Sequence, residues 1–242
     1  MIKLLLLLFG VLKAGKIGVT GLSMLLSLGL YATIWGWRYA AGFIVCLFVH
    51  EMGHVIAARQ RGLAVSAPAF IPFMGAFITL RDAPPDVETE AHVAIGGPLL
   101  GAVAAFGFYF AGQMDNDRLL LAISYSGFVL NLFNLLPVSP LDGGRITAVL
   151  GPRVWLAGAP LLLAAMLYAP SPALLIILVL AAPQLLRAWR YNPAAPENQI
   201  YYAIAPAKKL EYAVMYLALA GALAIMAYLV HETLSGGAQS AF

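Results

Sequence analysis

The chain has 242 residues, of which 62% are hydrophobic and 10% are charged, with a formal net charge of +3. Soluble domains carry roughly 25% charged residues, so this composition excludes an ordinary soluble globule. It also excludes disorder, which requires low hydrophobicity. The small net charge gives no reason to expect a nucleic-acid partner. We therefore expect an all-α polytopic membrane protein that is largely surrounded by the lipid bilayer.

The first sixteen residues combine a short apolar run with lysines on both sides of it. No small-residue cleavage site follows the run, which argues against a signal peptide. An uncleaved helix at the membrane interface is expected instead.

Crossing a bilayer as a helix takes about 20 predominantly apolar residues. Stretches of this kind predict about six to seven transmembrane helices. The last long stretch exceeds the length of one crossing, and Pro170 and Pro172 in its middle predict a break into a pair. The predicted spans are residues 17–37, 39–58, 91–114, 119–141, the pair within 154–186, and 212–230.

The basic residues predict the orientation of these spans. If the N-terminus is cytoplasmic, every lysine and arginine falls on the cytoplasmic side except Arg38 and Arg118. Such an asymmetry is what the positive-inside rule requires.

The second span ends in the pattern H-E-x-x-H, formed by His50, Glu51 and His54. Residues four apart share a helix face, so both imidazoles can reach one metal ion, with Glu51 beside it. Ionisable side chains at membrane depth are functional candidates because they are costly to bury there. A polar cluster that only links helices is the structural alternative, but it does not require this spacing.

A catalytic zinc ion needs three protein ligands and one open position. The third ligand is open between His92, at the start of the third predicted span, and Asp142, which follows the uncharged stretch 119–141. Asp142 is favoured, because a helix that stops at a proline and then presents a carboxylate between small residues can bring it close to a metal.

The H-E-x-x-H motif in one membrane helix, with N-x-x-P and L-D-G on a later one, resembles the site-2 protease family of intramembrane zinc metalloproteases. The resemblance covers about residues 38–151. It implies that His50, His54 and Asp142 bind one zinc ion and that Glu51 is the catalytic base. It also implies that Asn134, before the proline, acts close to the active site.

The third span departs from the family at one position. Relatives often carry G-P-x-x-N there, and this chain has Gly101 in place of the asparagine. The role of that position is therefore open. The polar segments are too short to hold a PDZ or CBS domain, which predicts a minimal family member.

The connection between the second and third spans is unusually apolar for a loop, yet it is too short and too proline-broken to cross. Non-helical backbone at membrane depth requires shielding by protein or a cavity. In the family that this chain resembles, a strand-like segment at this place pairs with an extended substrate. We therefore expect a small strand-like or re-entrant segment here, with Phe77, Ile78 and Thr79 binding substrate.

These observations predict a zinc-dependent intramembrane endopeptidase that hydrolyses transmembrane segments of other proteins. The alternatives are a metal-binding membrane transporter and a non-proteolytic membrane scaffold. We expect a multi-pass protein of a bacterial plasma membrane with its active site toward the cytoplasm. The predicted regions are an interfacial helix (1–16), a catalytic membrane core (17–151), and C-terminal transmembrane helices with a short tail (152–242).

Overall fold

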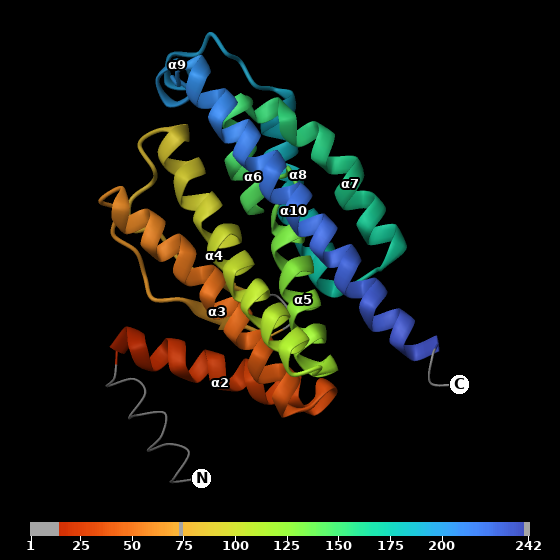
Figure 1. Ribbon diagram of the computed structural model, residues 1–242. Helices are drawn as coiled ribbons and strands as arrows, with labels where there is room; N and C mark the ends of the chain where they lie inside the picture. The colour runs from red at the N-terminus through yellow and green to blue at the C-terminus, as the bar shows by residue number, and fades with distance from the viewer. Residues whose placement is uncertain (1–14, 73–74, 240–242) are drawn as a thin grey trace.

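The computed structural model describes residues 15–72 and 75–239, and nearly all of the predicted interfacial helix (1–16) lies outside them. Most of the described chain is helical (Figure 1). The elements in chain order are α2 (Gly15–Trp35), α3 (Trp37–Gln60), β1 (Ala69–Ile71), β2 (Gly75–Phe77), α4 (Val87–Met114), α5 (Arg118–Asn134), α6 (Asp142–Thr147), the 3-10 turns η1 (Ala148–Leu150) and η2 (Pro152–Val154), α7 (Trp155–Tyr168), α8 (Pro172–Trp189), α9 (Pro196–Tyr201) and α10 (Pro206–Gln239).

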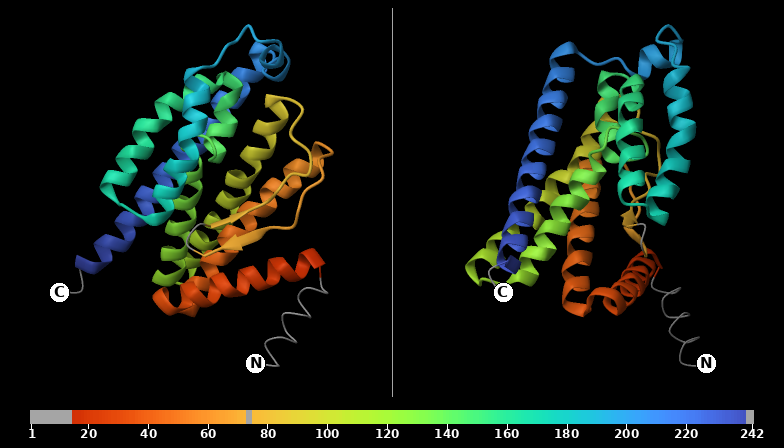
Figure 2. Two further views of the ribbon diagram at one scale, coloured as in Figure 1. Left: turned by 180° about the vertical axis from the view of Figure 1, so that it is seen from behind. Right: turned by 90° about the vertical axis from the view of Figure 1, so that its right-hand side faces the viewer.

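Within the described residues, four helices are long and apolar enough to cross a membrane: α3, α4, α8 and α10. The described chain is thus mostly helical, as expected, and has four candidate membrane spans. The predicted span over residues 17–37 is not among them, although α2 is apolar. Both figures draw α2 across the end of the bundle rather than alongside the other helices (Figures 1 and 2).

The core of the bundle is formed by α3, α4 and α5, which pack side by side. Gly53 of α3 faces Gly96 of α4 so closely that a Cβ atom on Gly53 would lie 2.1 Å from the Gly96 carbonyl oxygen. Small residues allow membrane helices to approach to backbone contact. This close approach brings the polar end of α3 against α4.

The fourth predicted span, 119–141, is divided in the structure. α5 ends at Asn134, and α6 begins at Asp142 after a turn that contains Pro137 and Pro140. Proline disfavours helical backbone in the residue before it and cannot donate a backbone hydrogen bond, so the helix stops ahead of Pro137. The chain therefore folds back at this depth instead of continuing as a helix to residue 141.

The predicted break near Pro170 is confirmed. α7 ends at Tyr168 and α8 starts at Pro172, where the Ser171 hydroxyl accepts a hydrogen bond from the Leu174 amide at 3.2 Å. A serine N-cap followed by proline is a common helix start. The last helix is longer than predicted, because α10 runs from Pro206 to Gln239 rather than over 212–230.

The strand-like segment between the second and third predicted spans is a two-stranded antiparallel sheet, in which Phe70 of β1 pairs with Ala76 of β2. The Phe70 amide donates to the Ser23 hydroxyl at 3.2 Å, which ties β1 to α2. Seen from behind, the two strands lie along α3 (Figure 2). The expected small strand-like segment is thus present, and it borders the helix that carries the H-E-x-x-H motif.

Candidate metal centre

The H-E-x-x-H motif lies in the second half of α3, which places both histidines on one helix face. His50, Glu51 and His54 are all buried, at 4%, 4% and 5% exposure. Burial of three ionisable side chains in a membrane helix is costly unless they have partners or a function.

Asp142, the first residue of α6, supplies the third side chain. Its Oδ2 atom lies 3.2 Å from His50 Nε2 and 3.2 Å from His54 Nε2, and the two Nε2 atoms are 3.2 Å apart. The turn between α5 and α6 produces this convergence, because it returns the chain toward α3.

The spacing of these three atoms fits a single zinc ion. Two ligand atoms at about 2.0–2.1 Å from a tetrahedral zinc ion are separated by about 3.3 Å. The chemistry fits as well, because two imidazoles and a carboxylate form a common donor set for catalytic zinc. His50, His54 and Asp142 are the one buried group of this kind within the described residues.

Both imidazoles are oriented by their second nitrogen. His54 Nδ1 lies 2.9 Å from the Val93 carbonyl oxygen, and His50 Nδ1 lies 2.8 Å from Asn131 Oδ1. Because each partner is an acceptor, this arrangement favours the proton on both Nδ1 atoms, which leaves both Nε2 atoms able to bind a metal ion. Gly97 of α4 is needed for this packing, since a Cβ atom there would lie 2.3 Å from His54 Nε2.

Glu51 is the unusual member of the motif. Its Oε2 atom is buried and makes no hydrogen bond with any described residue. Buried polar atoms are nearly always paired, and a lone carboxylate oxygen is costly. Such an orphaned atom beside three convergent ligand atoms is suited to receive a proton from a bound water or substrate.

A cavity of about 290 Å³ opens in front of His50 and Glu51. Its other walls come from β2, from the end of α5, from the turn before α6 and from one face of α8. Asn134 lines this cavity, and its Nδ2 atom donates to the Leu130 carbonyl oxygen at 3.1 Å.

The three residues predicted to bind substrate occupy different positions. Phe77 lines the cavity and is 47% exposed. Thr79 pairs with Ser66 instead, since its amide donates to the Ser66 hydroxyl and its carbonyl oxygen accepts from the Ser66 amide, both at 2.8 Å. Ile78 lies between them, is partly buried, and is not among the residues that line the cavity.

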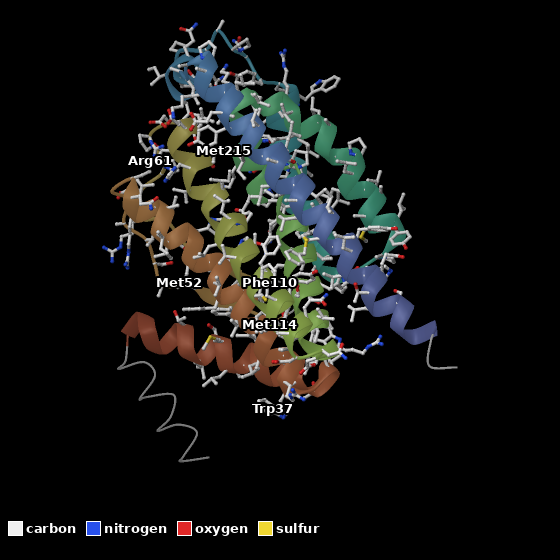
Figure 3. All side chains as sticks on the ribbon, in the orientation of Figure 1. Trp37, Met52, Arg61, Phe110, Met114 and Met215 are labelled. Atoms are coloured by element: carbon white, nitrogen blue, oxygen red, sulfur yellow. The ribbon has the colours of Figure 1, made fainter. Side chains whose placement is uncertain are left out.

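His92, the alternative third ligand, lies away from the cluster. Its Nε2 atom is 3.0 Å from Gln60 Oε1 at the end of α3. Both side chains line a separate groove of about 600 Å³ between α3, α4 and α10, which also includes Arg61 and Met215 (Figure 3). The structure thus brings Asp142, and not His92, to the two motif histidines.

Arg145 connects Asp142 to the periphery. Its guanidinium lies 3.9 Å from Asp142 Oδ1 and 3.3 Å from Glu90 Oε1, and the Tyr201 hydroxyl of α9 donates to Glu90 Oε2 at 2.5 Å. Burial and the neighbouring Glu90 carboxylate raise the pKa of the Tyr201 hydroxyl, so it remains a donor across the physiological range. The arginine is thus ion-paired with Asp142 Oδ1, whereas Oδ2 lies beside the two histidines.

Residues 38–126, which carry the H-E-x-x-H motif, match peptidase family M50, the family of site-2 proteases. The match covers less than half of the 242 residues, so it shows a similarity to peptidase family M50. The matched segment includes most of α3, the two strands, α4 and part of α5. Asn131, Asn134 and Asp142 lie beyond it, so their place in the site is given by the geometry described above.

Proteins similar to part of this chain are named as zinc metalloproteases. A zinc metalloprotease of Methanocaldococcus jannaschii is 30% identical over 107 residues, which cover 42% of this chain and 31% of that protein. The protein named probable zinc metalloprotease EGY1, chloroplastic, of Arabidopsis thaliana is 28% identical over 153 residues, covering 44% of this chain and 28% of the relative. The chain therefore spans less than a third of the length of either relative.

The sequence did not indicate one polar residue of the candidate metal centre. Asn131 is fully buried and holds His50, whereas one turn later Asn134 faces the cavity. The feature of the sequence that could have indicated Asn131 is Gly101. The absence of a side chain there is required, because a Cβ atom would lie 2.2 Å from Asn131 Oδ1. The Asn131 carboxamide thus occupies the space beside Gly101, which the sequence alone left without a role.

Proposed function

We propose that this chain is a zinc-dependent intramembrane endopeptidase that hydrolyses peptide bonds in or near transmembrane segments of membrane-protein substrates. The observation that carries the proposal is the convergence of His50, His54 and Asp142 beside a buried Glu51 carboxylate with an unpartnered oxygen. A peptidase requires both parts, a ligand set and a base, and the cavity reaches both, because His50 and Glu51 line it.

Each residue has a separate task in peptide hydrolysis. A zinc ion held by the two histidines and Asp142 supplies a Lewis acid and a water of lowered pKa. Glu51 takes the proton of the attacking water as the new C–O bond forms, and it delivers that proton to the nitrogen as the C–N bond breaks. Asn134 offers its carboxamide to the substrate backbone or to the developing oxyanion.

The substrate segment must be extended at the bond that is cut, because a helix hides its backbone groups. In the described residues β2 has a strand only on its β1 side, and its residues line the cavity. An extended apolar segment that pairs with β2 would place a peptide bond in the cavity beside His50 and Glu51. The apolar α8 residues Ala173, Ile176 and Ile177 on the opposite wall suit aliphatic substrate side chains.

We expect the Phe77→Pro variant to reduce cleavage about tenfold or more, because proline removes a backbone donor from β2. Zinc content should not change, since the strand contributes no ligand. Rates with a fixed transmembrane substrate and zinc per chain are the two measurements. The Phe77→Ala variant is the control, because it shortens the side chain but keeps the backbone donor. Equal effects of the two variants would contradict pairing through the backbone.

We propose further that α5 and α7 cross the membrane with the four long apolar helices, which gives six crossings. Arg61 and Trp37 lie at opposite ends of α3 (Figure 3). Arg38 pairs with Asp117 at the Trp37 end. In this assignment Arg145 and most other basic residues lie on the same side of the membrane as Arg61. By the positive-inside rule this asymmetry supports a cytoplasmic location for the Arg61 end, and the membrane that we propose is a bacterial plasma membrane.

In this assignment residues 17–151 form the catalytic core, and residues 152–242 flank it. A transporter or a scaffold is the rival function. A buried Glu51 carboxylate beside a ligand set with room for a water favours hydrolysis over transport or scaffolding.

Removal of the metal tests the proposal. The full chain, purified in detergent, should contain one zinc ion and cut a model transmembrane substrate at a defined bond identified by mass spectrometry. A zinc chelator should abolish the cut, and stoichiometric zinc should restore it. A chain that retains zinc but cleaves none of a panel of transmembrane segments would favour transport or scaffolding.

A further inference from the structure

We propose that Asn131 is a positioning residue that fixes His50 as a metal ligand, and that Gly101 is required to make room for it. The inference rests on the proposed zinc site. Its test is metal affinity, so it can fail independently of peptidase activity.

The Asn131 carboxamide is held at both ends. Its Nδ2 atom donates to the Gly127 carbonyl oxygen at 2.7 Å, and its Oδ1 atom lies 2.8 Å from His50 Nδ1. Because Gly127 offers only an acceptor, the amide nitrogen must face it, and the amide oxygen must face His50. His50 then carries its proton on Nδ1, which leaves Nε2 directed at Asp142 and His54.

The two histidines differ in how this orientation is obtained. His54 donates to the backbone carbonyl oxygen of Val93, which any residue at that position provides. His50 depends on a side chain, so its orientation is encoded by the identity of residue 131. An acceptor of this kind is typically worth 10–100-fold in metal affinity.

Gly101 and Asn131 form one unit across the contact between α4 and α5. A Cβ atom on Gly101 would lie 2.2 Å from Asn131 Oδ1 and 2.7 Å from Nδ2, so any side chain would displace the amide. Both residues are buried, which leaves the amide nowhere to move without losing His50. The substitution Gly101→Ala should therefore act on the metal only through Asn131.

Asn134 is the matched control. It lies one turn further along α5 and has the same carboxamide group. Its Nδ2 atom, however, donates to the Leu130 carbonyl oxygen, and the residue lines the cavity. Its removal should leave His50 in place.

The experiment measures zinc affinity of the full chain in detergent by competition with a chelating dye. We expect the Asn131→Ala variant to bind zinc about 10–100-fold more weakly, and the Asn134→Ala variant to bind within about twofold of wild type. Gly101→Ala should weaken binding in wild type but cause no further loss in the Asn131→Ala background. Such non-additivity identifies two residues that act through one contact.

The reciprocal exchange provides a rescue. In the Asn131→Ala background, Gly101→Asn returns a carboxamide to the vacated space and should recover affinity, whereas Gly101→Asn alone should weaken it. Wild-type affinity of Asn131→Ala, or additive losses in the double variant with Gly101→Ala, would overturn the proposal. If Asn131→Ala does not fold, unchanged affinity of Gly101→Ala would overturn it as well. Asn131-dependent zinc binding without any cleavage would instead count against the proposed function alone.

Discussion

The Glu51→Gln variant is expected to lose cleavage by about 10²–10⁴-fold while retaining its zinc. Glutamine has the shape of glutamate but cannot accept a proton, and general acid–base catalysis contributes a factor of this size. The proposed ligand atoms belong to His50, His54 and Asp142, so the metal should stay bound. Single-turnover cleavage of a transmembrane substrate and zinc per chain are the measurements.

The stability of this variant gives a second readout. Glu51 Oε2 is buried and has no hydrogen-bond partner among the described residues, so its charge destabilises the fold. The amide should therefore leave the melting temperature unchanged or raise it, as is common when an active-site group is neutralised. Glu88→Gln is a matched control, because Glu88 forms a partly exposed ion pair with Arg61 away from the cavity. Wild-type cleavage by Glu51→Gln would exclude Glu51 as the base, and loss of zinc would make it a ligand.

Local sequence patterns correctly predicted those features that are determined by residues close together in the sequence. The four-residue spacing of His50 and His54 is enough to place them on one face of α3, and their rings lie 4.8 Å apart between centroids. The break between α7 and α8 follows equally locally from Ser171 and the prolines beside it. In both cases the interaction that decides the structure spans only a few residues.

The contribution of Asp142 required information that no local pattern holds. It lies far along the chain from α3, and only the turn after Asn134 carries it back to the histidines. The sequence predicted a helix that stops at a proline before Asp142, but it carried the span to residue 141 instead of Asn134 and left His92 as an alternative. The packing of α3 against α4 separates these alternatives, because it directs His92 toward Gln60.

Asn131 and α2 show two further limits. A buried asparagine in an apolar helix is equally consistent with a bond between helices and with a bond to a catalytic histidine. The choice depends on the space beside Gly101, which is a property of two packed helices. Similarly, α2 is apolar and is long enough for a crossing. Length and composition, however, do not specify how a helix lies relative to its neighbours (Figure 2).

The Asp142→Ala variant should lose zinc affinity by more than the 10–100-fold that the loss of an outer hydrogen bond costs, because a direct ligand is removed. His92→Ala should retain its zinc, since His92 bonds Gln60 outside the cluster. Equilibrium dialysis against a zinc buffer measures both.

The effect of Asp142→Ala needs to be separated from damage to the fold, because Asp142 also faces Arg145. Asp142→Asn keeps the size of the side chain and an oxygen, but it removes the charge that a zinc ligand provides. Arg145→Gln removes the partner and leaves the carboxylate in place. If Asp142 acts as a ligand, Asp142→Asn should resemble Asp142→Ala in zinc affinity, and Arg145→Gln should retain more zinc than either. Zinc loss in His92→Ala with full retention in Asp142→Asn would show instead that the cluster of His50, His54 and Asp142 is a polar contact between helices and that the metal lies elsewhere.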